Sequence, residues 1–281
     1  MREYNLKNIR REFKEQGIFY TQKELALYLK SFLPDDVREV YDPTCGNGGL
    51  LCVFADSVEK YGQDVNAEQV QAAREQLVNF HGAVGDTLTE PAFSDRKFRY
   101  IIANPPFSIK WTPHTDERFA ALPCLPPKSK ADYAFLAHIL HYLTDDGTAV
   151  VLNYPGILYR RNAEGKIRRW MVEQNYVEAV VQVDGGHFVD TQISTAVLVL
   201  KKRRSEREIR FLHGEREVKV AFEEIEKNNF DLTVSHYLPQ AVEREAVDIV
   251  KLNAEIETIV AREDVLRNEI NSIIAEIEGK G

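Results

Sequence analysis

Residues 37–49 read Val-Arg-Glu-Val-Tyr-Asp-Pro-Thr-Cys-Gly-Asn-Gly-Gly, a short β-like run that ends in a glycine-rich turn. Glycine allows the backbone to pass close to a ligand at places where a Cβ atom would clash. We expect a helix over about 49–60, whose first turn would present unpaired N–H groups. The turn matches neither a phosphate loop ending in Gly-Lys-Ser/Thr nor the pattern Gly-x-Gly-x-x-Gly, which favours a nucleoside ligand without a pyrophosphate.

On both sides of this turn the chain alternates β-like and helical runs. The β-like runs are expected over residues 37–41, 58–63, 80–84, 98–103, 147–153, 177–183 and 194–201, and the helices over 22–33, 49–60, 66–79, 131–143 and 164–175. This alternation predicts an α/β fold in which helices cover both faces of a parallel sheet. Since no helix separates the last two β-like runs, we expect them to form an antiparallel edge hairpin.

The chain is expected to have four parts. They are an N-terminal helical segment over 1–34, the α/β domain over 35–203, a charged, irregular extension over 204–240 and a long helix over 241–281. In the last part apolar residues recur at helical spacing, with Glu263 as a charged break, and this predicts a heptad seam. The seam consists of Ile249, Leu252, Ile256, Ile259, Leu266, Ile270, Ile273 and Ile277.

The composition is that of a globular protein, with 281 residues, 44% hydrophobic and 28% charged. Three cysteines without a Cys-x-x-Cys spacing argue for a reducing compartment, and no metal site is expected. No apolar run is long enough for a signal segment or a membrane span, so we expect a cytoplasmic protein that does not bind membranes. A formal net charge of −8 argues against a tight nucleic-acid binder without local basic patches or a partner.

Asp64 closes the β-like run that follows the glycine-rich turn, 22 residues after Asp42. An acidic residue at this place can accept hydrogen bonds from ribose hydroxyls, as in nucleoside-binding α/β folds. The alternative interpretation is a tight β–α turn with acidic residues on the surface, because glycine-rich turns are common.

Asn104-Pro105-Pro106-Phe107 follows an apolar β-like run and carries the sharpest chemical signal. Two consecutive prolines fix φ and remove two N–H donors, and their carbonyl groups remain as acceptors. The lone pair of an aromatic amine such as adenine N6 is delocalised into its ring. If Asn104 Oδ1 and the Pro105 carbonyl accept the amino hydrogens, they pull this nitrogen toward a tetrahedral geometry, from which it can attack a sulfonium methyl group. The alternative is a rigid turn with Phe107 in the core.

Together these segments resemble the S-adenosylmethionine-dependent N6-adenine DNA methyltransferases, and above all the modification subunit of type I restriction-modification systems. The similar segments span roughly residues 16–240, in the order of the gamma arrangement, and include Gly17-Ile-Phe-Tyr-Thr, Gly62-Gln63-Asp64, Gly85-Asp86-Thr87-Leu88, Asp132-Tyr-Ala-Phe-Leu and Tyr154-Pro-Gly-Ile-Leu-Tyr-Arg. The resemblance implies a Rossmann-like S-adenosylmethionine-dependent methyltransferase fold. This fold has a mostly parallel seven-stranded sheet with an antiparallel edge hairpin, followed here by the long C-terminal helix.

The resemblance also implies which residues bind the cofactor, S-adenosyl-L-methionine. They are Tyr20, Thr21, Asp42, Thr44, Gly46, Gly48, Asp64, Asp86 and Asn104. Tyr20 and Thr21 would lie near the methionine carboxylate, and Asp42, Gly46 and Gly48 would surround the methionine part. Asp64, where the family has Glu, would hold the ribose hydroxyls, and Asp86 would accept from the adenine amino group.

The catalytic residues implied by the resemblance are Asn104, Pro105, Pro106 and Phe107. Asn104 and Pro105 would bind the target amine, and Phe107 would stack on an adenine flipped out of duplex DNA. Compared with the family, the helical region ahead of Gly17 and a DNA-recognition domain after residue 203 are expected to be missing or supplied by another chain. The implied partners are therefore DNA, a separate specificity subunit docked on the C-terminal helix and a companion nuclease subunit.

Other interpretations stay open at this point. The Asn-Pro-Pro-Phe motif also suits guanine N2 of ribosomal RNA or a protein Gln amide, and a non-catalytic assembly module is a third possibility. Phosphate contacts are expected from a basic cluster, with charged solvated surface as the alternative. The cluster and its neighbours are Arg160, Arg161, Lys166, Arg168, Arg169, Lys110 and Trp111.

Overall fold

The computed structural model describes residues 23–185, 194–238 and 249–278. The chain divides into two units, Met1–Pro239 and Gln240–Gly281. In its described part the first unit is built on one sheet, and the second contains the helix α8 (Ile249–Glu278).

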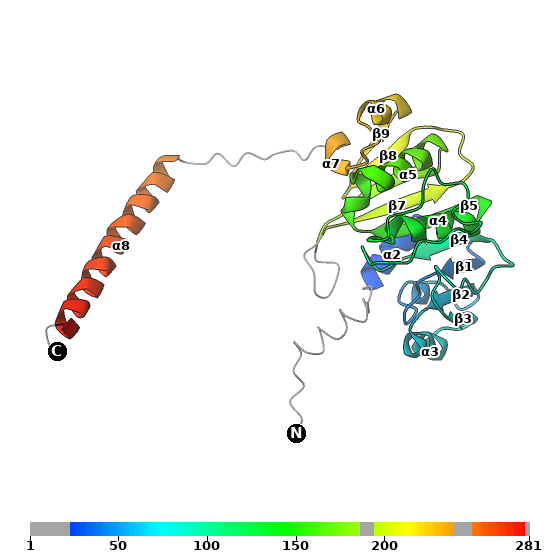
Figure 1. Cartoon of the computed structure of the whole chain (residues 1–281), viewed down its shortest axis with the longest axis horizontal. Coiled ribbons are helices and arrows are strands. Elements are labelled where there is room, and N and C mark those ends of the chain that lie inside the picture. Colours follow the sequence, from blue (N-terminus) through cyan, green and yellow to red (C-terminus); the bar gives the residue numbers. More distant parts are fainter. Residues whose placement is uncertain (1–22, 186–193, 239–248, 279–281) are drawn as a thin grey trace, which may run out of the picture. The chain divides into compact units, whose positions relative to one another are not determined.

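The described residues form a sheet of nine strands in the order β3-β2-β1-β4-β5-β7-β6-β8-β9, with β3, β2 and β1 at the bottom and β8 and β9 at the top of Figure 1. The strands are β1 (Glu39–Asp42), β2 (Glu59–Asp64), β3 (Phe80–Val84), β4 (Phe98–Ala103), β5 (Leu143–Asn153), β6 (Val177–Val183), β7 (Thr195–Lys201), β8 (Ile209–His213) and β9 (Arg216–Val220). β1 to β5 are parallel to one another, and so are β6 and β8, whereas β7 is antiparallel to both of its neighbours and β9 to β8.

The predicted α/β fold is confirmed, but the predicted seven-stranded sheet is wrong, because β8 and β9 extend it. β6 and β7 do pair in antiparallel fashion, but they do not form an edge hairpin, since β7 lies between β5 and β6. β8 then pairs with the open side of β6, and Phe211 of β8 is fully buried in the core. The irregular structure expected over 204–240 is therefore wrong, and the boundaries of the four expected parts stay predictions.

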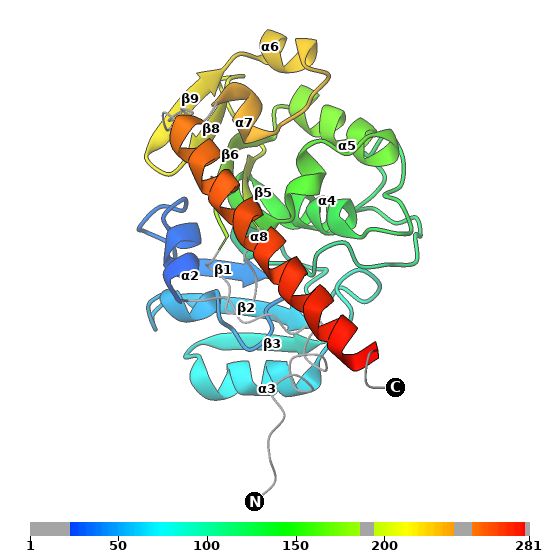
Figure 2. The same cartoon turned by 90° about the vertical axis from the view of Figure 1, so that its left-hand side faces the viewer.

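Helices cover both faces of the sheet, as the view turned by 90° shows (Figure 2). The α-helices of this unit are α2 (Lys23–Lys30), α3 (Ala67–Gln76), α4 (Asp132–Tyr142), α5 (Asn162–Glu173), α6 (Phe222–Lys227) and α7 (Val234–Tyr237). Side chains of α4 to α7 form one core cluster with the sheet, and α2 forms the cluster on the other face. Successive side chains of a strand point to opposite faces of the sheet. From Tyr100 to Ala103 of β4 they therefore alternate between the clusters, with Ile101 and Ala103 in the first and Tyr100 and Ile102 in the second.

The helix expected over 49–60 is wrong. The glycine-rich turn is followed by a single 3₁₀ turn, η1 (Leu51–Val53), and the chain is extended again at Phe54. Leu51 and Phe54 are both buried, so packing in the core holds this segment in a conformation other than a long helix. The segment after η1 is held by Lys60, whose Nζ donates to the carbonyl of Ala55 at 2.8 Å and to that of Val58 at 3.0 Å. A ligand at this turn would meet loop amides and not the end of a long helix.

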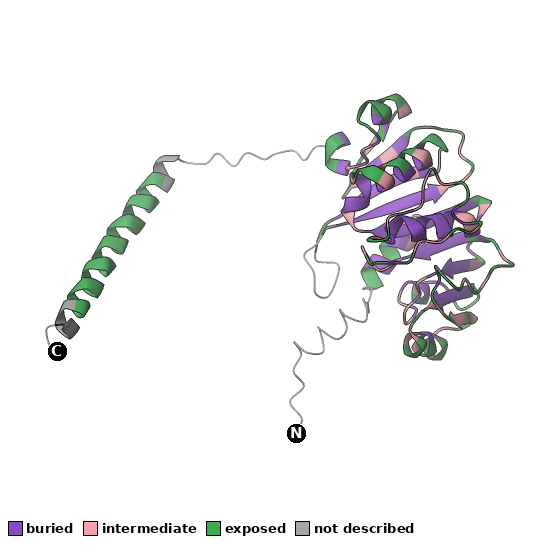
Figure 3. Ribbon diagram, in the orientation of Figure 1, coloured by how far each residue is buried: buried purple, intermediate pink, exposed green. Residues whose placement is uncertain are grey.

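Helix α8 confirms the helix predicted from the heptad pattern over its described residues. Its residues 253–254 and 256–274 are exposed (Figure 3), and they include five residues of the seam. They are Ile256, Ile259, Leu266, Ile270 and Ile273, each at least half exposed. Within the described ranges, no helix combines the length and apolar character that crossing a bilayer requires.

If β8 is an integral part of the sheet, replacing its buried ring will destabilise the whole first unit. Phe211→Ala should lower the free energy of unfolding by about 3–5 kcal/mol, because a large cavity forms in the core. The measurement is urea unfolding followed by far-UV circular dichroism, with exposed Glu215→Ala as the control. A loss below about 1 kcal/mol would show that this hairpin adds little to the core.

Candidate active site at the β1 and β4 strand ends

The two predicted motifs, the glycine-rich turn and Asn-Pro-Pro-Phe, lie where the strand order of the sheet reverses. β1 lies between β2 and β4, and all three are parallel, with Tyr41 opposite Ile101. β1 therefore ends at Asp42 beside the end of β4 at Ala103, on neighbouring strands about 4.8 Å apart. In open α/β sheets, ligands bind outside the carboxyl ends of the strands at such a reversal. The glycine-rich turn and the Asn-Pro-Pro-Phe motif consequently share one edge.

Asp42 is the most deeply buried acid of this edge, with 1% of its surface exposed. Its Oδ1 accepts a hydrogen bond from the Thr44 N–H at 2.9 Å, which closes the turn. Burial, reinforced by the nearby Asp64 and opposed by the bonds from Thr44, raises the pKa of Asp42 from 3.8 to about 7. A desolvated carboxylate of this kind favours a cationic ligand.

Asp64 joins the end of β2 to the glycine-rich turn. Its Oδ2 accepts from the Gly46 N–H and its Oδ1 from the Asn66 N–H, both at 2.9 Å. The Cys45 N–H also donates to the Gln63 carbonyl at 2.9 Å. A carboxylate oxygen has a further lone pair, so Asp64 can accept a ligand hydroxyl while it holds the turn.

Gly46 and Gly48 of the turn have different surroundings. Both have a positive φ, +51° at Gly46 and +86° at Gly48. A Cβ atom on Gly46 would meet nothing within 4 Å, so this residue borders open space. A Cβ atom on Gly48 would lie 2.6 Å from Leu77 Cδ1, so packing against α3 explains that position. The open side of Gly46 is therefore where a ligand can approach the backbone.

The segment after β3 is fastened to the same turn. Asp86 is exposed and its Oδ1 accepts from the Leu88 N–H at 2.9 Å, while the buried Thr87 hydroxyl donates to the Pro43 carbonyl. Arg118 donates to the carbonyls of Thr87 at 2.8 Å and Leu88 at 2.6 Å. The sequence interpretation missed Arg118, because a single arginine in a proline-rich loop has no spacing signal.

The Asn-Pro-Pro-Phe motif leaves the sheet at the end of β4. Asn104 is half-buried, Pro105 is buried, and the half-buried Phe107 packs against the core cluster that contains α2. The motif therefore has a structural contact at Phe107, whereas Asn104 and Pro106 are partly exposed. The next residue, Ser108, has a φ of +54°, an uncommon conformation outside glycine.

Val65 is a second residue that the sequence interpretation missed. It directly follows Asp64, and its side chain is 71% exposed. An exposed apolar side chain at the end of a strand can offer a surface for a flat ring. The signal was present in the sequence as the pair Asp64-Val65 at the end of a β-like run.

The predicted basic cluster is only partly available to DNA. Arg168 is buried and donates to the Phe230 carbonyl at 2.7 Å and the Arg160 carbonyl at 2.8 Å, and Trp111 is buried as well. Arg169 pairs with Glu173. The expectation of phosphate contacts is therefore wrong for the buried Arg168 and Trp111, and it stays a prediction for the exposed Lys110, Arg161 and Lys166.

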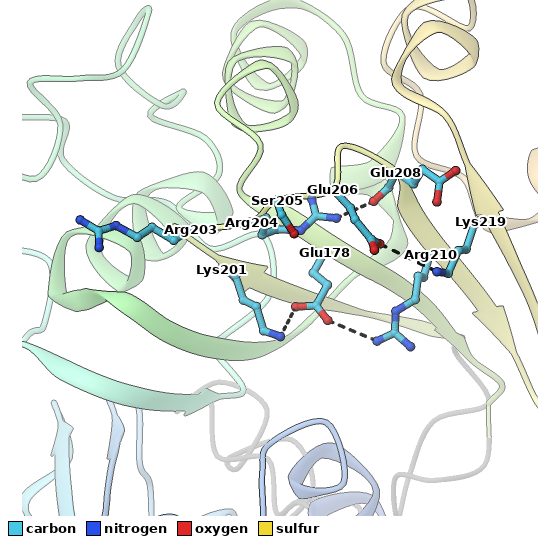
Figure 4. Close-up of a pocket in the computed structure, with 9 residues that line it drawn as sticks. All are labelled: Glu178, Lys201, Arg203, Arg204, Ser205, Glu206, Glu208, Arg210 and Lys219. Carbon is cyan, nitrogen blue, oxygen red and sulfur yellow. Dashed lines mark hydrogen bonds and ion pairs between the residues drawn. The ribbon is translucent and has the colours of Figure 1, made fainter.

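Tyr20 and Thr21 lie outside the described residues. Within the described part of the chain, no group of three or more His, Cys, Asp or Glu side chains is placed to hold a metal ion. A charged hollow of ≈230 Å³ lies around the start of β6 and the end of β7, at the opposite edge of the sheet (Figure 4). Glu178 forms ion pairs there with Lys201 and Arg210.

Residues 1–219 match the family described as N-6 DNA methylases. The chain belongs to this family.

Named relatives agree with this assignment. The chain is 32% identical to the methylase subunit of the type I restriction enzyme MpnII from Mycoplasma pneumoniae, over 94% of this chain and 61% of that protein. It is 30% identical to the HindI methylase subunit of Haemophilus influenzae, over 69% of this chain and 49% of that subunit. The chain thus spans about half to three fifths of the length of these relatives.

A solved structure supports the same family fold. The methyltransferase subunit of a type I restriction-modification system from Streptococcus thermophilus superimposes with a TM-score of 0.71 at 28% identity. The match covers 77% of this chain and 58% of that subunit.

The raised pKa of Asp42 predicts a pH dependence of stability. Between about pH 4 and pH 7 the folded chain holds a proton at Asp42 that the unfolded chain has released, so the free energy of unfolding falls as the pH rises. Asp42→Asn should therefore exceed wild type in stability by on the order of 4 kcal/mol at pH 8, with no difference below pH 4. Urea unfolding at a series of pH values measures this.

Exposed Asp145→Asn controls for the general effect of losing one negative charge. A difference between Asp42→Asn and wild type that stays constant from pH 4 to pH 8 would contradict the burial argument.

Proposed function

We propose that this chain transfers a methyl group from S-adenosyl-L-methionine to adenine N6 in DNA, as the catalytic subunit of a type I restriction-modification assembly. The observation that carries the proposal is the pairing of β1 with β4, which sets the glycine-rich turn and the Asn-Pro-Pro-Phe motif side by side. The family match and the names of the relatives favour DNA over ribosomal RNA or a protein amide as the acceptor.

The residues present fit the cofactor. The open side of Gly46 admits a ligand against the backbone, and the buried carboxylate of Asp42 suits the cationic methionine part. Asp64 would accept from the ribose hydroxyls, while Asp86 would bind the adenine amino group and Val65 would pack on its ring. When bound, the cofactor supplies an electrophilic methyl group on a sulfonium. Thr44 keeps the Asp42 carboxylate oriented through its N–H at 2.9 Å.

Asn104 and Pro105 would act on the target amine. The Asn104 Oδ1 and the Pro105 carbonyl accept the two amino hydrogens, which localises the nitrogen lone pair and directs it toward the methyl donor. After transfer the nitrogen loses one proton to solvent, because amide oxygens are too weakly basic to keep it. Phe107, held at its back by the core cluster, would present a ring face to the flipped base.

Target recognition would reside on a partner. The exposed apolar seam of α8 fits a helical partner, and we propose a specificity subunit as this partner. A companion nuclease subunit belongs to the same proposal. Exposed Lys110, Arg161 and Lys166 would contact DNA phosphates.

The decisive experiment replaces the proposed acceptor of the target amine. Asn104→Ala should lower kcat for methyl transfer at least about 100-fold, because one of two transition-state hydrogen bonds is lost. Transfer of labelled methyl groups to unmethylated DNA is measured with the specificity subunit present, and cofactor affinity by calorimetry. The affinity should stay nearly unchanged. Asn104→Asp keeps an acceptor oxygen and should retain more activity than Asn104→Ala.

If the wild-type chain binds the cofactor but forms no N6-methyladenine, the enzymatic proposal is refuted and an assembly module remains. If Asn104→Ala keeps full activity, the role assigned to this motif is wrong.

A separate prediction concerns helix α8. The double variant Ile259→Asp, Ile270→Asp places two charges on the apolar seam and should abolish co-purification with the specificity subunit. The matched control, Thr258→Asp with Asn271→Asp, adds the same charge at exposed positions off the seam. Equal co-purification of both variants would exclude the seam as the docking surface, provided that circular dichroism shows equal helix content.

A further inference from the structure

The backbone directly after the Asn-Pro-Pro-Phe motif is held in an unfavourable conformation. Ser108 has a φ of +54°, in the left-handed region. This conformation costs a non-glycine residue about 1 kcal/mol or more, so it persists where neighbouring groups hold it. The groups that hold Ser108 therefore control how the chain leaves Phe107.

Asp132, the first residue of α4, holds the main chain of Ser108. Its Oδ1 accepts from the Ser108 N–H at 3.1 Å, and its side chain is 1% exposed. Among the described residues, the buried Oδ2 has no hydrogen-bond partner, and the Arg160 Nη1 is a cation 3.7 Å away. A buried carboxylate is expensive unless a positive charge compensates it, so Asp132 depends on Arg160.

Arg160 holds the side chain of the same serine from the segment after β5. Its Nη2 donates to Ser108 Oγ at 3.1 Å, and its Nη1 donates to Glu164 Oε1 at 3.2 Å. The main chain of Arg160 is itself fixed, because the buried Arg168 donates to its carbonyl at 2.8 Å. A planar guanidinium can serve two acceptors in fixed directions, whereas the ammonium group of a lysine cannot.

We infer that Asp132 and Arg160 are positioning residues for the Asn-Pro-Pro-Phe motif. They grip Ser108 at its N–H and at its hydroxyl, from two different elements, and so fix the direction of the Phe107 ring and of the carbonyls before it. This inference rests on the proposed function. It also explains why the segments Asp132-Tyr-Ala-Phe-Leu and Tyr154 to Arg160, which lie outside the proposed cofactor site, carry charged residues turned inward.

The test is a double-mutant cycle on methyl transfer, using the full chain with its specificity subunit and DNA. Asp132→Asn keeps an acceptor for Ser108 but removes the negative charge. Arg160→Lys keeps the positive charge but removes the planar guanidinium with its two donor nitrogens. Each should lower kcat about 10- to 100-fold, because small misplacements of reacting groups have effects of this size. The KM for S-adenosyl-L-methionine and the Tm should stay near wild type. The double variant should be no slower than the slower single variant.

Arg203→Lys and Asp145→Asn provide the matched control, because this ion pair of 3.4 Å is exposed and lies away from the site. Neither control variant should change kcat. The inference is overturned if kcat of the two site variants stays at the wild-type value or if their losses multiply as independent effects. It is also overturned if kcat falls only in proportion to the Tm and cofactor affinity, as a merely structural role would require.

A readout without turnover separates this inference from the proposed function. Amide hydrogen exchange of the segment 104–110 should be faster in both site variants, about 10-fold or more, with unchanged exchange in β2. A wild-type chain without transfer activity would refute the proposed function, and exchange would still decide whether Asp132 and Arg160 hold Ser108. Unchanged exchange in 104–110 would refute the positioning role.

Discussion

The parallel pairing of β1 with β4 is the constraint on which the site depends. Main-chain hydrogen bonds along this pair set where each strand ends, and the polar groups of both turns lie beyond those ends. No residue of the glycine-rich turn needs to touch the Asn-Pro-Pro-Phe motif for the two to face a common space. The strand order reverses here, and in open α/β sheets ligands bind outside the strand ends at such a reversal.

The acidic and the basic side chains near these strand ends have different partners. The acids Asp42 and Asp64 face the glycine-rich turn, where a cationic ligand would offset the cost of burying Asp42. The buried arginines Arg118 and Arg168 instead donate hydrogen bonds to main-chain carbonyls. They stabilise loops that regular secondary structure does not hold, which lets irregular segments keep a fixed geometry beside the strand ends.

The strands with continuous apolar runs could be predicted from the sequence, and β4 and β6 begin and end at the expected residues. β8 and β9 were missed because their short runs alternate with charged residues and follow a stretch of lysine and arginine. The helix expected after Gly49 was wrong, since local helical spacing cannot show that Phe54 turns into the core. Motif residues were identified by their order along the chain, whereas Arg118 and Arg160 act through contacts distant in sequence.

This difference follows from the chemistry of each kind of residue. Asn104 and Pro105 need particular atoms at particular places, so a short motif records them. The residues that support a motif need only donate to a carbonyl, accept from an N–H or balance a buried charge, and several residue types at many positions could do so. Asp132 lies 24 residues from Ser108 and Arg160 lies 52 residues from it. Both residues contact Ser108, whose φ is +54°, because the fold places α4 and the segment after β5 near the end of β4. The sequence alone does not indicate this contact.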